Sequence, residues 1–279
     1  MVMITGSGQV DRDENHKRLR LNVFGELAGR LAGRGFDSLR YDKRGVGRSE
    51  GDFWTAGLYD NAAGVAAAVD YVRADAATRD DEVFLLGHSE GAFLATQVAA
   101  KTQGLAGVIL LAGGARSGED ELRWQAEQVA KGLRGFQAFL IRLLRIDVFK
   151  AQAKQIAKIK RSTADFYRVQ GLAKVNAKWM REFLDYNPAG DLVRITCPVL
   201  AITGSKDIQV SPDNLPVMKN LVKGPFESHA VPDVTHILRA DPGLPTLSTY
   251  KEQVKKPVDP RVVDLILDWL ESRTGLAST

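Results

Sequence analysis

A short apolar run that passes into a serine flanked by glycines constrains this chain more than any other feature. Residues Val83–Leu86 are apolar, the pentapeptide Gly-His-Ser-Glu-Gly occupies 87–91, and small residues at helical spacing follow. Strand, glycine-flanked turn and helix in this order predict a sharp strand-to-helix turn with Ser89 at its tip. Glycine suits both flanking positions because a side chain there would collide across the turn.

The rest of the chain alternates between short apolar segments and longer segments with helical spacing. Expected strands are Val2–Thr5, Phe36–Tyr41, Glu82–Leu86, Gly107–Leu111, Val199–Thr203 and Glu227–Val231, and expected helices are Lys17–Ala32, Tyr59–Ala74, Gly91–Lys101, Leu215–Leu221 and Arg261–Arg273. Several of the strands are apolar throughout, which is typical of strands covered on both faces. The sequence therefore predicts an α/β fold with a mostly parallel sheet and helices on both faces.

One interval breaks this alternation. Between about Ser117 and Tyr186 no segment has a convincing strand pattern, and Gln, Lys, Arg, Ala and Leu recur at helical spacing. About 70 residues is far longer than a normal connection between elements. We expect a core formed by residues 1–116 and 187–279, with an inserted helical cap at 117–186.

Composition excludes several classes of protein. The chain has 279 residues, of which 44% are hydrophobic, enough for a large buried core rather than disorder. Its 38 basic and 34 acidic residues leave a net charge of only +4, which does not by itself indicate nucleic acid, because such binding needs a clustered basic face. Cys197 is the only cysteine, so no intrachain disulfide is expected. Without an apolar run long enough for a signal peptide or membrane span, we expect a cytoplasmic location.

A serine nucleophile needs a general base, and the sequence offers four histidines. His236 follows the last expected strand directly, and so falls at the carboxyl end of the sheet, where α/β folds place their sites. His88 adjoins Ser89, but its side chain should point away from the hydroxyl. His229 lies inside an expected strand, and His16 lies in a polar surface stretch. We expect His236 to be the base.

The carboxylate that orients the base should also follow a strand. Asp207 fits, because it comes after the apolar segment Val199–Thr203 and a glycine turn. Asp213 follows Ser-Pro and is typical of a helix start. Asp233 is too close to His236 in sequence for an easy approach. Asp207 is therefore the expected acid.

Acyl transfer also requires hydrogen-bond donors for the oxyanion. The backbone N–H of Glu90, directly after the serine, should be one donor, and that of Ser7, in the loop after the first strand, the other. The nearby segment Asp11–Asn15 has alternating oxygens, but it lacks the glycine and the final glutamate of a calcium loop. We expect it to brace the oxyanion loop, and the proposed chemistry needs no metal or cofactor.

These motifs resemble the α/β-hydrolase superfamily, in its bacterial carboxylesterase and lysophospholipase-like branch. The pentapeptide at 87–91, then Asp207, then His236 match the family's order of nucleophile, acid and histidine. The segments at 6–15, 41–49 and 204–210 also look like this branch. The resemblance implies a serine hydrolase that cleaves carboxylic esters through an acyl-enzyme, with the insertion as a cap over the acyl pocket.

The sequence departs from the family pattern in two places. Thr5 stands where the family often has a histidine, which concerns the shape of the oxyanion loop. The antiparallel strands that usually precede the first parallel strand are apparently missing. An exposed sheet edge would result, which a second copy of the chain could cover, so a homodimer is one expectation.

Substrate preference is left open by the triad alone. Aromatic residues of the insertion are candidates for the wall of a pocket for a small-molecule acyl ester: Trp124, Phe136, Phe139, Phe166 and Trp179. The basic stretch Arg142–Arg161 suits a solvated helix face, which we favour, or contact with an anionic membrane surface. Thioesterase, lactonase, peptidase and lysophospholipase activities stay open, as does a non-catalytic binding protein on the same scaffold.

Overall fold

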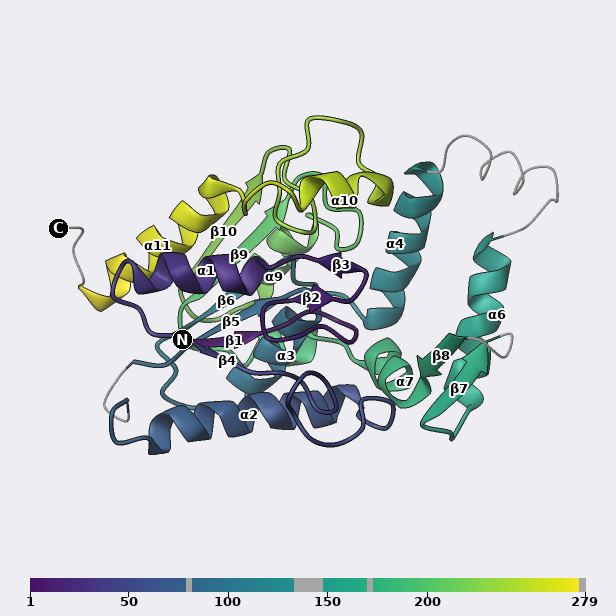
Figure 1. Ribbon diagram of the computed structural model, residues 1–279, viewed down its shortest axis with the longest axis horizontal. Helices are drawn as coiled ribbons and strands as arrows, with labels where there is room; N and C mark the ends of the chain where they lie inside the picture. Colours follow the sequence, from purple (N-terminus) through teal and green to yellow (C-terminus); the bar gives the residue numbers. More distant parts are fainter. Residues whose placement is uncertain (79–81, 133–147, 170–172, 276–279) are drawn as a thin grey trace.

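The centre of the molecule is a parallel β-sheet. The computed structural model describes residues 1–78, 82–132, 148–169 and 173–275. In these residues six strands form the sheet: β1 (Val2–Ile4), β4 (Leu39–Arg40), β5 (Phe84–His88), β6 (Gly107–Leu111), β9 (Val199–Gly204) and β10 (Phe226–Val231). Their order is β10-β9-β6-β5-β1-β4, and every pairing is parallel (Figure 1). The predicted strands and the parallel sheet are confirmed.

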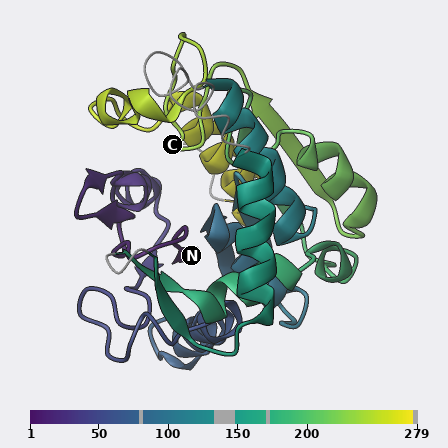
Figure 2. The ribbon, with the colours of Figure 1, turned by 90° about the vertical axis from the view of Figure 1, so that its right-hand side faces the viewer.

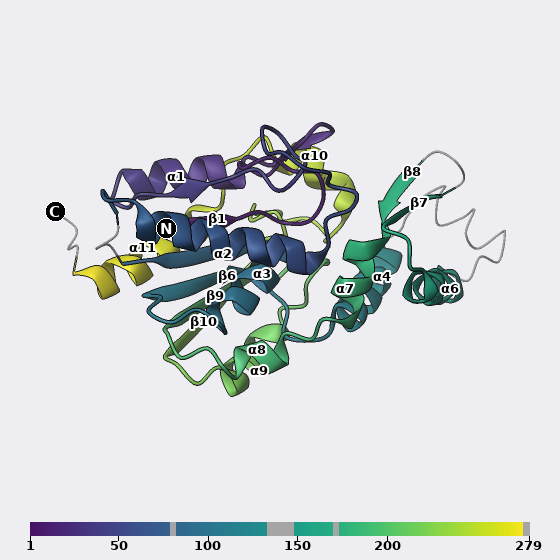
Figure 3. The same ribbon diagram turned by 90° about the horizontal axis from the view of Figure 1, so that it is seen from below.

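Helices cover both faces of this sheet. α1 (Val23–Ala32) and α11 (Pro260–Thr274) lie on one face, whereas α2 (Leu58–Ala74), α3 (Glu90–Ala99), α8 (Ala189–Leu192) and α9 (Asn214–Leu221) lie on the other (Figures 1 and 3). Side chains alternate along each strand, so Leu86 belongs to the first core and Leu85 to the second. Both faces are therefore apolar, as the continuous hydrophobic strands predict.

The sequence around α11 shows how local signals fix a helix. The Asp259 side chain accepts a hydrogen bond from the Arg261 N–H at 3.0 Å, and Pro260 occupies the first turn. Gly275 ends the helix with φ 67°, a left-handed conformation that glycine adopts without strain. The 3₁₀ turn η1 (Leu247–Thr249) and α10 (Tyr250–Gln253) precede it.

The expected helix over Lys17–Ala32 is too long at its start. α1 begins only at Val23, and β2 (Asn15–His16) and β3 (Leu19–Arg20) form a small antiparallel pair before it. Asn22 has φ 50°, which interrupts helical backbone, and its N–H donates to the Asn15 side chain at 3.1 Å. The local hydrogen bonds of Asn15 therefore replace the first turns of the expected helix.

The segment between β6 and β9 contains α4 (Gly118–Gly132), α6 (Val148–Arg161) and α7 (Ala177–Asp185), and it projects beyond the sheet (Figures 1 and 2). The expectation that it holds no strand is wrong. β7 (Phe166–Val169) and β8 (Ala173–Asn176) form an antiparallel pair. Each has four residues, several of them charged or polar, so the alternation was too short to recognise.

α7 is attached to the core at the beginning of α2. The Asn176 side-chain amide donates to the carbonyls of Phe53 and Ala56, at 2.7 Å each. The Glu182 carboxylate accepts from the Tyr59 N–H at 3.0 Å. These polar contacts fix one side of the insertion against the core.

β4 forms one edge of the sheet, and in the described residues no antiparallel strand pairs with it. In the same residues, no helix is long and apolar enough to cross a membrane.

Candidate active site

Ser89 lies at the turn between β5 and α3, as the motif predicts. Its backbone has φ 56° and ψ −120°, an unfavourable conformation for a residue with a side chain. A Cβ at Gly87 would overlap the carbonyl of Gly91, and one at Gly91 would overlap the carbonyl of Ile4. Only glycine fits at both positions, so the two glycines allow the turn that exposes the Ser89 side chain.

The structure brings together the serine, the histidine and the aspartate that the sequence indicates. The Ser89 hydroxyl lies 3.0 Å from His236 Nε2, and His236 Nδ1 lies 2.8 Å from Asp207 Oδ2. The other Asp207 oxygen accepts from the N–H groups of Gln209 and Val210 at 2.8 and 2.9 Å. With the Nδ1 proton donated to Asp207, Nε2 can accept the serine proton.

The other candidates lie in different surroundings. Asp233 forms an ion pair with Lys206 at 2.7 Å, and Asp213 stands at the start of α9. His229 contacts Glu227 at the surface, and His16 belongs to β2. In the described residues, no hydrogen bond or ion pair joins these four to Ser89, His236 or Asp207.

The loop that carries His236 is held by a buried arginine to which the sequence analysis gave no role. The Arg239 side chain is fully buried and donates to the carbonyls of Ile237 and Leu21, at 2.9 and 2.7 Å. It also pairs with Glu26 of α1 at 2.8 Å. Burial lowers the pKa of Arg239, although the Glu26 carboxylate opposes this shift. Arg239 therefore joins the histidine loop to α1.

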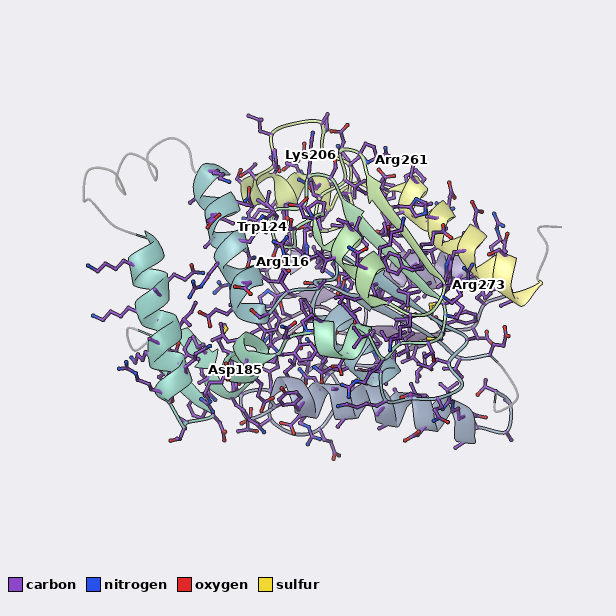
Figure 4. The ribbon with its side chains drawn as sticks, turned by 180° about the vertical axis from the view of Figure 1, so that it is seen from behind. Arg116, Trp124, Asp185, Lys206, Arg261 and Arg273 are labelled. Atoms are coloured by element: carbon purple, nitrogen blue, oxygen red, sulfur yellow. The ribbon has the colours of Figure 1, made fainter. Side chains whose placement is uncertain are left out.

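Two further cations brace the same loop from outside, and Figure 4 shows both on one side of the molecule. Lys206 Nζ donates to the carbonyl of Asp241 at 2.7 Å, and an Arg261 N–H donates to that of Pro232 at 3.0 Å. Inside the loop, the Thr235 hydroxyl donates to the Gln253 side chain at 2.6 Å. The backbone around His236 is thereby fixed at several points.

His88 and Glu14 form a buried pair beneath the serine turn. His88 Nδ1 lies 2.8 Å from one Glu14 oxygen and 3.0 Å from the other, and His88 Nε2 lies 2.9 Å from the carbonyl of His236. Because the His236 carbonyl can only accept, Nε2 carries a proton, and Nδ1 shares a proton with the Glu14 carboxyl group. Burial alone would lower the pKa of His88, but the adjacent Glu14 carboxylate raises it overall. The raised pKa favours the charged ring, so we expect His88 to be an imidazolium, and its two contacts link the two halves of the site.

The oxyanion loop is clamped at Gly6. The Gly6 N–H donates to Glu14 at 2.5 Å, and the Gly6 carbonyl accepts from Lys43 Nζ at 2.5 Å. In a trans peptide, the carbonyl of one residue and the N–H of the next point in opposite directions. Lys43 therefore turns the Ser7 N–H away from itself, and Ser7 lines the cavity at Ser89. The segment containing Glu14 braces this loop, as the sequence analysis expected.

Lys43 is buried and has a second contact. Its ammonium group lies 3.7 Å from the Glu90 carboxylate, which also accepts from Asn61 at 3.0 Å. Glu90 begins α3, so its backbone N–H is at the positive end of that helix, next to Ser89. Lys43 thus contacts both predicted oxyanion residues, Ser7 through its peptide and Glu90 through its side chain. The sequence contained no signal for this lysine.

A cavity of about 470 Å³, partly open to solvent, lies in front of Ser89. Its walls come from both the core and the insertion: Ser7, Ser89, Glu90, Phe93, Glu121, Leu122, Gln125, Trp179, Phe183, Gln209 and Val210. Of the five aromatic residues proposed for the wall, the structure brings Trp179 to this cavity. Trp124 lies on α4 (Figure 4), and Phe166 is 40% exposed with its ring 3.7 Å from Lys174 Nζ; neither is among the described lining residues. Phe136 and Phe139 lie outside the described residues.

The structure adds no support for metal binding or for contact with a membrane. In the residues that the structure covers, no group of three or more His, Cys, Asp or Glu side chains could hold a metal ion. The basic stretch Arg142–Arg161 is described from residue 148 onward, where it forms α6, with Lys150, Lys154 and Lys158 exposed. Contact between this face and a membrane stays a prediction.

A parallel sheet with a serine at its strand-to-helix turn, followed in order by an aspartate and a histidine, defines an α/β hydrolase. The family described as "Serine aminopeptidase, S33" matches residues 20–241, and the chain belongs to this α/β-hydrolase family. The predicted fold and superfamily are therefore confirmed.

The chain is also similar to several individual proteins. It is 26% identical to esterase EstD of Thermotoga maritima over 273 residues, which cover 97% of this chain but only 61% of EstD. Est1E of Butyrivibrio proteoclasticus, solved with ferulic acid, superposes with a TM-score of 0.64 at 18% identity, covering 98% of this chain and 88% of Est1E. A Paleococcus ferrophilus monoacylglycerol lipase gives a TM-score of 0.59 at 18% identity, covering 98% and 94%. At these identities the solved structures support the fold alone.

Proposed function

We propose that this protein is a serine esterase that cleaves carboxylic esters through an acyl-enzyme. The observation that carries the proposal is the hydrogen-bonded series from Ser89 through His236 to Asp207, which opens into the cavity of about 470 Å³. A structural polar network would not require a strained serine at the mouth of a cavity. The name of the sequence relative EstD, an esterase, favours an ester over an amide substrate.

The first half-reaction transfers the acyl group to the enzyme. His236 accepts the hydroxyl proton of Ser89 while the serine oxygen attacks the ester carbonyl, and Asp207 stabilises the imidazolium that forms. The backbone N–H groups of Ser7 and Glu90 donate to the oxyanion, each worth about 3 kcal/mol in the transition state. Collapse of the tetrahedral intermediate transfers the proton from His236 to the leaving alcohol.

The second half-reaction releases the acid. Water enters the position vacated by the alcohol, gives its proton to His236 and attacks the acyl carbonyl. The same two backbone donors stabilise the second oxyanion, whose collapse breaks the bond to Ser89 Oγ while His236 returns the proton to that oxygen. In this proposal the insertion at 117–186 acts as a cap: Trp179 and Phe183 form the substrate wall, and the core residues 1–116 and 187–279 carry out the chemistry.

The direct test is hydrolysis of p-nitrophenyl esters from acetate to palmitate by the protein and by Ser89→Ala. Catalysis is expected to fall by several orders of magnitude in the variant, with the melting temperature unchanged within a few degrees. Near-normal activity in Ser89→Ala would refute the assignment of the nucleophile. The chain-length optimum would also separate a short-chain esterase from a lysophospholipase.

Covalent labelling tests the alternative of a binding protein on a hydrolase scaffold. A fluorophosphonate probe should label the protein at Ser89, and it should fail to label Ser89→Ala. Absence of labelling in the intact protein would favour the non-catalytic alternative. A homodimer and a cytoplasmic location stay predictions, which gel filtration and fractionation of the source cells can check.

A further inference from the structure

Glu121 is a buried carboxyl group in the cavity to which the proposed mechanism gives no task. It lies in the first turn of α4, is only 4% exposed, and lines the same cavity as Ser89. Neither of its side-chain oxygens has a hydrogen bond of good geometry in the part of the chain that the structure describes, although the Asn214 side chain and the Ser211 N–H lie near enough to stabilise the carboxylate. Such a group costs stability when it is buried, so its presence in the cavity calls for a compensating role.

The polar neighbours of Glu121 also have other partners. The side chain of Asn214 donates to the Ser211 carbonyl at 3.0 Å and accepts from the Ala115 N–H at 2.9 Å. Arg116 precedes α4 (Figure 4) and forms no ion pair with Glu121 among the described residues. Burial raises the pKa of Glu121 to about 7. Hydrogen bonding to the Asn214 side chain and the Ser211 N–H, together with the charge of Arg116, partly opposes the shift, and the Asp207 carboxylate adds to it.

Helix α4 does not need this carboxyl for its own start. The Ser117 hydroxyl accepts from the Asp120 N–H at 3.2 Å, and the Ser117 carbonyl accepts from the Glu121 N–H at 3.0 Å. Two other acidic residues, Glu119 and Asp120, also lie in the first turn. The local role of an acidic residue at a helix start is thus already filled.

The rest of the cavity is mainly apolar and aromatic. The rings of Trp179 and Phe183 stack with centroids 5.1 Å apart and planes 7° apart, and Phe93 meets Phe183 edge to face at 5.4 Å. The polar side chains Gln125 and Gln209 bond to each other at 3.3 Å. The Glu121 carboxyl is therefore an incompletely paired polar group in a wall suited to flat or aliphatic substrate groups.

We propose that Glu121 selects substrates whose cavity-bound half carries a hydroxyl group, which would donate a hydrogen bond to the carboxyl. This inference rests on the proposed esterase function and adds a substrate class to it. A hydroxyl can donate to the ionised carboxylate and also pair with the neutral acid, so it suits both protonation states near neutrality. An ammonium group would pair well only with the ionised carboxylate, and it would give up more hydration than a hydroxyl group on entering the cavity.

Matched pairs of esters test the proposal, because a hydroxyl and a methyl group differ little in volume. For the acyl half we would compare methyl 3-(4-hydroxyphenyl)propanoate with methyl 3-(4-methylphenyl)propanoate. For the alcohol half we would compare 2-(4-hydroxyphenyl)ethyl acetate with 2-(4-methylphenyl)ethyl acetate. In one of the two series, the protein should favour the hydroxyl member by about tenfold or more in kcat/KM, the value of a hydrogen bond to a buried acceptor.

Variants then separate recognition from structure. In Glu121→Leu the preference should reverse toward the methyl member, whereas Glu121→Gln, which still offers an oxygen acceptor, should keep part of it. Glu127→Leu, an exposed position on the same helix, is the matched control and should leave the ratio unchanged. The melting temperature of Glu121→Leu should stay equal or rise, since an unpaired buried carboxyl is removed; a purely structural role would lower it and slow both esters equally.

The proposal is overturned if the protein favours the methyl member in both series, or if Glu121→Leu leaves the ratio unchanged. It is also overturned if the matching 4-aminomethyl esters are hydrolysed faster than the hydroxyl esters, because selection would then be for a cation. Failure of the esterase function itself would appear differently. The intact protein would then hydrolyse no ester faster than Ser89→Ala does, and the fluorophosphonate probe would not label it.

Discussion

Replacing Lys43 by methionine should slow catalysis although the lysine lies behind the oxyanion loop, out of the cavity in front of Ser89. Methionine keeps the length and apolar stem of the lysine but removes the ammonium group that holds the Gly6 carbonyl at 2.5 Å. Without that contact, the Gly6–Ser7 peptide can rotate, and the Ser7 N–H no longer points steadily into the cavity. The change therefore acts on one of the two proposed oxyanion donors.

The size of the effect follows from the contacts that remain. Complete loss of one oxyanion donor reduces kcat by about 10²–10³-fold. Glu14 still holds the Gly6 N–H at 2.5 Å and limits the rotation, so we expect a loss near the lower value, about 10²-fold. KM should change little, because the negative charge on the oxygen develops only in the transition state.

Stability needs a separate control, because Lys43 also pairs with Glu90. The Glu90 carboxylate is buried and would lose the cation 3.7 Å away, keeping only Asn61. Breaking a buried pair on one side costs about 3–5 kcal/mol, and this long contact should fall at the lower end. The double variant Lys43→Met/Glu90→Gln removes the unpaired charge. It should regain much of the free energy of unfolding, measured in urea, without regaining kcat.

Steady-state hydrolysis of a p-nitrophenyl ester and urea unfolding of both variants give the answer. If the double variant recovered both stability and kcat, the ion pair with Glu90 would matter and the hold on Gly6 would not. If Lys43→Met kept normal kcat with intact folding, the peptide-orientation argument would be wrong.

Three further changes have clear expected outcomes. Gly91→Ala should abolish activity and lower the melting temperature, because its methyl group would overlap the β1 backbone. The control Gly29→Ala has open space around it and should raise stability by up to about 1 kcal/mol. Equal melting temperatures for the two variants would contradict this. Glu14→Ala should lower the free energy of unfolding by about 3–5 kcal/mol, since it leaves the His88 imidazolium buried without its anion; a loss below 1 kcal/mol in urea would mean that His88 is neutral. The pKa of Glu121 rises from 4.5 to about 7 on folding, so the carboxyl should cost stability as the pH rises through that window. The free energy of unfolding of Glu121→Gln should therefore gain up to about 3 kcal/mol on that of the unaltered protein between about pH 4 and pH 8. A difference that does not depend on pH would refute the shift.

The sequence was sufficient for features that depend on short segments. Most of the parallel strands are short, mainly apolar runs, so the sheet could be recognised, and Ser89 and Asp207 follow such runs while His236 follows the more polar strand β10. Because parallel strands end at one edge of a sheet, residues after different strands could be expected to meet there. The geometry of the triad thus follows from strand order and local turns.

The supporting charges could not be found in this way. Glu14 meets His88 across 74 positions, and Lys43 meets Gly6 across 37, and nothing local distinguishes these residues from surface charges. Glu121 reads as one of several acidic residues at a helix start. Their importance depends on burial, which is set only when distant segments pack. Strands β7 and β8 were not predicted for another reason: four residues are too few to show an alternation of apolar and polar side chains.

The hydrogen bond from His88 to the carbonyl of His236 has a consequence for engineering. It spans 148 positions and, with the contact between Ser89 and the His236 ring, ties the serine turn to the histidine loop at two points. A loop graft that displaces 232–241 would therefore pull the nucleophile out of place as well. In the described residues, the wall contributed by α4 and α7 makes no direct hydrogen bond to the triad, and its link to Asp207 runs through the long contact between Gln125 and Gln209. Libraries intended to broaden substrate range should accordingly vary that wall and keep the histidine loop intact.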